Sequence, residues 1–82
     1  MNALFSPLAL GRYTLANRLV MAPMTRSRAD DAGVPSDLVT TYYAQRATAG
    51  LIISEGVFPD ASGKGYARTP GIETAAQVAA WK

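Results

Sequence analysis

The sequence contains no cysteine and no histidine among its 82 residues. Without cysteine there are no disulfides or thiolate metal sites, and without histidine the most common metal ligand and general base are missing. Charged residues are also sparse at 17%, and eight Lys and Arg against six Asp and Glu leave a net charge of only +2. So small an excess does not indicate a nucleic-acid-binding surface. We therefore expect no metal site and no nucleic-acid partner.

Long apolar runs are missing as well. No apolar stretch approaches the roughly 20 residues that cross a membrane. Residues 1–10 lack the basic start of a secretory signal, and Ser6-Pro7 interrupts their apolar run. We expect a cytoplasmic protein with no membrane partner. The hydrophobic fraction of 49% still suits a folded interior, and the length allows one small domain at most, spanning residues 1–82.

The order of the apolar runs predicts an α/β chain. Two short runs around a glycine-containing pair predict a hairpin over residues 8–15. Residues 19–22, closed by Pro23, and residues 51–53 are continuously apolar, which is typical of parallel strands buried on both faces. A helical pattern lies between them, so strand, helix and strand form a right-handed βαβ unit.

Two amphipathic helices are predicted. Ser36 is a candidate N-cap for the first, and Gly50 sits where a C′ residue would end it. Thr74 and Gln77 form a capping box that opens the second. A long glycine- and proline-rich loop covers residues 56–71, and loops of this length are usually functional. The apolar faces carry Leu38, Val39, Tyr42, Tyr43, Arg46 and Ala47 in the first helix, and Val78 and Trp81 in the second.

The second helix reaches Lys82 without a signal that ends it. Parallel strands buried on both faces also need neighbours that these residues do not provide. A closed α/β barrel takes about 250 residues. We therefore expect these residues to be the opening of a longer protein.

Several short motifs occur in an order and at spacings that resemble the N-terminus of the Old Yellow Enzyme family of FMN-dependent ene-reductases. The nearest likeness is to the bacterial N-ethylmaleimide and nitrate-ester reductases. The resemblance extends over nearly all of the chain but only the opening part of such an enzyme. The motifs are residues 4–8 (LFSPL), 17–18 (NR), 21–26 (MAPMTR), 42–47 (YYAQRA), 50–56 (GLIISEG), 65–66 (GY), 69–72 (TPGI) and 81–82 (WK).

The resemblance implies the N-terminal portion of a TIM (β/α)8 barrel: a capping hairpin and the first two β/α units. Residues 19–23 would be the first barrel strand and residues 51–55 the second. Active sites of this fold lie at the C-terminal ends of the strands. The predicted strand ends therefore coincide with the positions at which the family contacts its flavin.

The resemblance also implies the cofactor-binding residues. Pro23 and Met24 would pack against the flavin ring, and the Thr25 hydroxyl would bind the flavin O4, where a donor stabilises the charge that builds on reduction. The Gly56 backbone N–H would face the flavin, and Tyr66 would line the substrate pocket. Ordinary roles compete with these: a turn cap for Thr25, a loop-entry glycine of unusual φ at Gly56, and an aromatic clasp at Tyr66. No catalytic residue of the family falls in this segment.

Buried charges are usually paired. An ion pair of Glu55 with Arg18 or Arg26 is therefore a structural expectation rather than a functional one.

The implied function is that of an oxidoreductase. NAD(P)H would reduce FMN, and the reduced FMN would then reduce an activated C=C bond in an enone or maleimide. Nitro compounds and nitrate esters are further candidate substrates. By the resemblance, the full-length protein would be the enzyme, and this chain would need the remainder of the barrel. One alternative is a non-catalytic fragment of a truncated or split barrel that acts only by association with a partner chain. Another is a multidomain relative, such as a dienoyl-CoA reductase or an amine dehydrogenase with an added iron–sulfur module.

Overall fold

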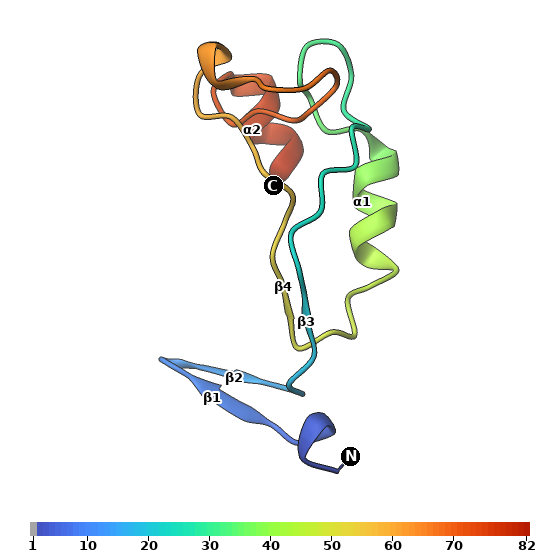
Figure 1. Ribbon diagram of the computed structural model, residues 1–82, viewed down its shortest axis with the longest axis vertical. Helices are drawn as coiled ribbons and strands as arrows, with labels where there is room; N and C mark the ends of the chain where they lie inside the picture. The colour runs from blue at the N-terminus through green and yellow to red at the C-terminus, as the bar shows by residue number, and fades with distance from the viewer. Residues whose placement is uncertain (1) are drawn as a thin grey trace.

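The chain begins with a small antiparallel hairpin, at the lower end of Figure 1. The computed structural model describes residues 2–82, which open with the 3-10 helix η1 (Asn2–Phe5). Strands β1 (Leu8–Leu10) and β2 (Tyr13–Leu15) then pair along their full length. Gly11 in the turn has a φ of +59°, which a residue without Cβ adopts most easily. The predicted hairpin is confirmed.

Strands β3 (Val20–Met21) and β4 (Leu51–Ile52) form the parallel pair in the middle of the molecule. The helix α1 (Asp37–Ala44) lies in the connection between them, as the βαβ pattern predicts. The strands are shorter than predicted. The last hydrogen bond between them runs from the Ile53 N–H to the Met21 carbonyl at 3.0 Å. Pro23 has no N–H with which to extend the ladder.

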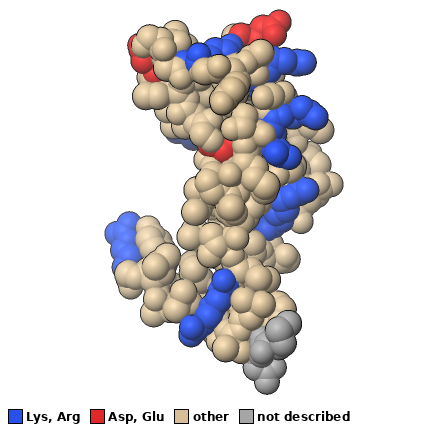
Figure 2. Space-filling view, viewed as in Figure 1, with Lys and Arg blue, Asp and Glu red and all other residues tan. Residues whose placement is uncertain are grey.

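The parallel pair is partly uncovered in the described residues, as expected of strands whose neighbours these residues do not provide. Val20 is 52% exposed and Ile53 is 46% exposed. Burial on both faces requires elements on both sides of a sheet and further strands at its edges. Figure 2 shows that the face viewed carries few charged side chains over this middle section, so much of the uncovered surface is uncharged.

Gly50 does not end the first helix. Helix α1 stops at Ala44, and several turns follow before Gly50 enters β4. The Gly50 N–H donates to the Leu19 carbonyl at 2.9 Å and to Asn17 Oδ1 at 2.8 Å. A Cβ at this position would lie 2.1 Å from the Asn17 carbonyl oxygen. Glycine is therefore required by the close approach of two backbone segments, not by a helix cap.

The start of α1 also differs in detail from the prediction. Ser36 occupies the N-cap, but its hydroxyl donates to the Arg28 carbonyl at 3.4 Å and makes no capping hydrogen bond. Val39 is the buried residue of the helix, whereas Leu38, predicted on the apolar face, is exposed.

The core lies in the loops beyond the C-terminal ends of β3 and β4, beside α2 (Ala75–Trp81), at the upper end of Figure 1. The buried Phe58 ring is in close contact with Gly33 and Gly71. Buried Gln77 donates to the Ala32 carbonyl at 2.8 Å and so ties α2 to the loop before α1. The predicted capping box is confirmed, and no helix among residues 2–82 is long and apolar enough to span a bilayer.

Candidate functional site

A hollow of about 280 Å³ opens at the C-terminal ends of the parallel strands. Thr25 reaches it from the segment after β3, and Gly56 reaches it from the segment after β4. Phe58, Tyr66 and Thr69 of the long loop complete much of its wall. The structure therefore brings together three of the five predicted site residues, which lie up to 41 positions apart in the sequence (66 − 25).

Pro23 and Met24 do not line this hollow. Both are exposed, Met24 to 41%, on the segment that leads from β3 toward Thr25. The side chains predicted to pack against a flavin ring are therefore uncovered in the described part of the chain.

Thr25 stands just before a sharp change in the path of the chain. Its carbonyl accepts a hydrogen bond from Arg26 Nε at 3.1 Å, and the Arg26 carbonyl accepts from Arg28 Nη1 at 2.8 Å. Ser27 has a φ of +53°, a left-handed conformation that is uncommon for a residue with a side chain. The exposed Thr25 side chain is left at the hollow, where its hydroxyl can donate to a ligand.

Gly56 has neither of the usual structural reasons to be glycine. Its φ is not positive, so a left-handed backbone is not what requires glycine at this loop entry. A Cβ built at Gly56 would meet nothing within 4 Å among the described residues, in contrast to the crowded positions of Gly50 and Gly71. Open space at an unstrained glycine is what a site needs where a planar ligand approaches the backbone.

Tyr66 is 71% exposed and lines the hollow. An aromatic clasp would pack its ring into the protein, so that alternative does not describe this side chain. The loop is held by other contacts: Thr69 Oγ1 donates to the Tyr66 carbonyl at 2.9 Å, and Phe58 forms a parallel bridge with Gly71. The Tyr66 ring therefore remains available at the rim.

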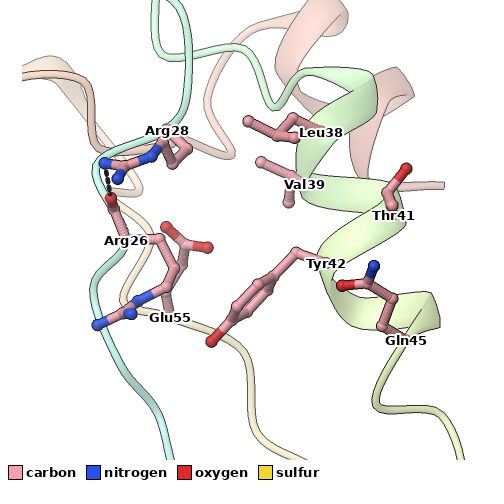
Figure 3. Close-up of a pocket in the computed structure, with 8 residues that line it drawn as sticks. All are labelled: Arg26, Arg28, Leu38, Val39, Thr41, Tyr42, Gln45 and Glu55. Carbon is pink, nitrogen blue, oxygen red and sulfur yellow. Dashed lines mark hydrogen bonds between the residues drawn. The ribbon is translucent and has the colours of Figure 1, made fainter.

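A second pocket, of about 290 Å³, lies between the segment after β3, the segment after β4 and α1 (Figure 3). Arg26 and Arg28 line one side, Val39 and Tyr42 line the other, and Glu55 contributes its carboxylate. Neighbouring residues thus line different spaces. Thr25 and Gly56 line the first hollow, whereas Arg26 and Glu55 line the pocket.

The predicted ion pair of Glu55 is wrong. The Glu55 carboxylate is buried, and its Oε2 accepts a hydrogen bond from the Tyr43 hydroxyl at 3.0 Å. The guanidinium groups of Arg26 and Arg18 donate instead to backbone carbonyls. Burial raises the pKa of Tyr43 above its ordinary value, although the hydrogen bond from the Glu55 backbone opposes the shift. Tyr43 was assigned to packing by its helical spacing, which carries no signal for this partner.

Metal chemistry has no support in this part of the chain. Among residues 2–82, no group of three or more Asp, Glu, His or Cys side chains is arranged to hold a metal ion.

A sequence model of the NADH:flavin oxidoreductase / NADH oxidase family matches residues 3–82. Chanoclavine-I aldehyde reductase of Penicillium roqueforti is 52% identical over 84 aligned residues, which cover 100% of this chain and 23% of that protein. The chain thus spans about a quarter of the length of this curated relative.

Solved structures give the same result at the level of the fold. Morphinone reductase is 53% identical and superimposes with a TM-score of 0.92, covering 96% of this chain and 21% of that one. The old yellow enzyme from Trypanosoma cruzi is 45% identical with a TM-score of 0.91, covering 98% of this chain and 22% of that one. These neighbours are TIM barrels, so the expectation of the N-terminal portion of such a barrel is confirmed.

Proposed function

Because the chain belongs to the NADH:flavin oxidoreductase / NADH oxidase family, we propose that it forms one side of the FMN site in an NAD(P)H-dependent reductase of activated C=C bonds. The convergence of Thr25, Gly56 and Tyr66 in one hollow, at the C-terminal ends of parallel strands, carries the proposal. In a TIM barrel this is the face where active sites lie.

The residues present fit a flavin. The uncrowded backbone at Gly56 leaves room for a flat ring, and the Thr25 hydroxyl offers a donor beside it. Pro23 and Met24 add exposed surface that can pack against an aromatic system, for which a polarizable thioether is well suited. FMN, when bound, would carry hydride from NAD(P)H to the alkene.

In this site Thr25 and Gly56 bind and orient the cofactor. A donor at the flavin O4 stabilises the negative charge of the reduced ring because it is held in place before the charge develops. Tyr66 stands at the rim and limits which substrates can lie over the ring. We propose activated alkenes such as enones and maleimides as substrates, with the remainder of the barrel supplying the other parts of the site.

The test is to purify the protein from its native source and measure its flavin content, followed by NADH- and NADPH-dependent reduction of an enone. We expect a yellow protein with bound FMN that oxidises the nicotinamide when the enone is added. A protein that binds no flavin and leaves the enone unchanged would refute the proposal.

A second candidate function is association without catalysis, as part of a truncated or split barrel. Two exposed apolar side chains, Val20 in β3 and Ile53 directly after β4, favour it because they need a covering surface. Gel filtration of the native protein distinguishes the two candidates. A flavin-free complex with a separate chain supports association, whereas a flavin-containing enzyme in one chain supports the reductase.

A further inference from the structure

We propose that Tyr43 and Glu55 form a positioning pair that sets the direction of the Gly56 N–H toward the flavin. The inference rests on the proposed function. It assigns a role in cofactor binding to two residues that lie outside the hollow, one on α1 and one in the segment after β4.

The pair is joined by two hydrogen bonds in opposite directions. The Glu55 N–H donates to the Tyr43 hydroxyl oxygen at 2.9 Å, and the same hydroxyl donates to Glu55 Oε2 at 3.0 Å. Glu55 is only 2% exposed. One phenol therefore holds both the backbone and the side chain of Glu55, and it does so from a helix rather than from a flexible loop.

The backbone carbonyl of Glu55 is also held by a hydrogen bond. The Ser54 hydroxyl donates to the Glu55 carbonyl at 3.1 Å. This carbonyl and the Gly56 N–H belong to the same planar peptide group. The hydrogen bond to the Glu55 carbonyl restrains the plane of this peptide, and the hydrogen bond from the Glu55 N–H restrains the peptide before it. With the peptides on both sides of the Glu55 Cα restrained, the direction of the Gly56 N–H is restrained as well.

Such support matters most at a glycine. Gly56 has no side chain to pack, and apart from its two chain neighbours no described residue has an atom within 4 Å of the position that a Cβ would occupy. Its own surroundings therefore restrain it little, and glycine has more accessible backbone conformations than any other residue. The residue before it has to supply the rigidity that a binding site requires.

The pair is also poorly explained by stability alone. Glu55 Oε1 is buried and has no hydrogen-bond partner among the described residues. Arg26 and Arg28 line the same pocket (Figure 3), yet they donate to backbone carbonyls. A buried carboxylate oxygen without a partner is costly, and apolar replacements of similar shape are often neutral or stabilising. Retaining Glu55 is consistent with a role at the site.

The experiment compares variants of the full-length flavoprotein by FMN dissociation constant, flavin reduction potential and melting temperature. In Tyr43→Phe, we expect the dissociation constant for FMN to rise about fivefold, as for the loss of one hydrogen bond. The reduction potential should fall because a misdirected N–H stabilises the reduced ring less. Tyr42→Phe is the matched control, since the neighbouring ring packs edge-on against Tyr43 at 5.1 Å, whereas the hydrogen bond to the Glu55 carboxylate comes from the Tyr43 hydroxyl.

Tyr43→Phe also leaves a buried carboxylate with no donor, and it could fail to fold. The double variant Tyr43→Phe/Glu55→Met removes both side-chain partners and leaves only the backbone N–H of residue 55 without its acceptor. It should therefore recover part of the melting temperature that Tyr43→Phe loses. We expect it to retain the weakened FMN binding and the lowered potential. Wild-type affinity and potential in a folded double variant would overturn the positioning role. A wild-type protein that binds no FMN would instead overturn the proposed function.

Discussion

Replacing Gly50 by alanine tests the close approach between the backbone of Gly50, just before β4, and that of Asn17, before β3. The added Cβ would lie 2.1 Å from the Asn17 carbonyl oxygen and 2.9 Å from the Asn17 carbonyl carbon. These contacts are with backbone, which cannot move aside by a change of rotamer. The β4 segment must therefore shift away from the segment that carries Asn17.

The shift has a calculable cost. Overpacking of this kind destabilises by about 1–3 kcal/mol. The two hydrogen bonds of the Gly50 N–H, to Leu19 and Asn17, would lengthen or break, at a net cost of about 0.5–1.5 kcal/mol each. We expect a total loss of about 2–6 kcal/mol, which is a large part of the ~5–15 kcal/mol that holds a typical domain together.

Gly65→Ala is the matched control. A Cβ at Gly65 would meet nothing within 4 Å in the part of the chain that the structure describes, and the φ of Gly65 is not positive. We expect its free energy of unfolding to lie within about 0.5–1 kcal/mol of the wild type. Denaturant unfolding of the full-length protein, followed by circular dichroism, measures both variants. If Gly50→Ala were as stable as Gly65→Ala, the explanation of Gly50 by close approach would be refuted.

Three further predictions concern the site, the core and pH. Thr25→Ala should lower the flavin reduction potential by about 30–60 mV, the equivalent of ~1.5–3 kcal/mol for a donor to a charged acceptor in a two-electron reduction. Thr25→Ser should restore the potential, and an unchanged potential in Thr25→Ala would remove the proposed role. Gln77→Ala should lower the free energy of unfolding by about 2–4 kcal/mol. The buried Gln77 side chain donates to the Ala32 carbonyl and accepts hydrogen bonds from two backbone N–H groups at the start of α2, and all three would be lost. A loss below ~1 kcal/mol would contradict this explanation. Because folding raises the pKa of Tyr43, the native state holds that proton more tightly than the unfolded chain. The resulting stability is present below the unfolded pKa of about 10 and is lost as the pH rises through the higher folded value. A plot of unfolding free energy against pH should show less alkaline loss in Tyr43→Phe than in the wild type.

Features that depend on a few neighbouring residues could be predicted from the sequence. The hairpin follows from two short apolar runs around Gly11, and the capping box follows from the side chains of Thr74 and Gln77 three positions apart. The parallel pair follows from two apolar runs with a helical pattern between them. The positions of Thr25 and Gly56 at the strand ends follow from the same runs, helped by the family resemblance.

Features that depend on distant residues were missed or misassigned. Gly50 was interpreted as a helix cap because nothing near it in the sequence indicates the approach of Asn17. Glu55 was expected to pair with an arginine because opposite charges attract, yet the fold places the Tyr43 hydroxyl against it. The burial of Phe58 likewise depends on Gly33 and Gly71, which belong to two separate loops.

The sequence by itself therefore determined the order of the elements, the parallel pairing and the chemical types of the residues at the strand ends. Periodicity, capping and turn chemistry act over a few residues, and these patterns can be read without knowing the path of the chain. Only the tertiary structure decided that Thr25, Gly56 and Tyr66 share one hollow and that Tyr43 holds Glu55 behind it. Close approach, burial and hydrogen-bond partners across the fold depend on where distant segments meet, and that is determined by packing rather than by any local pattern.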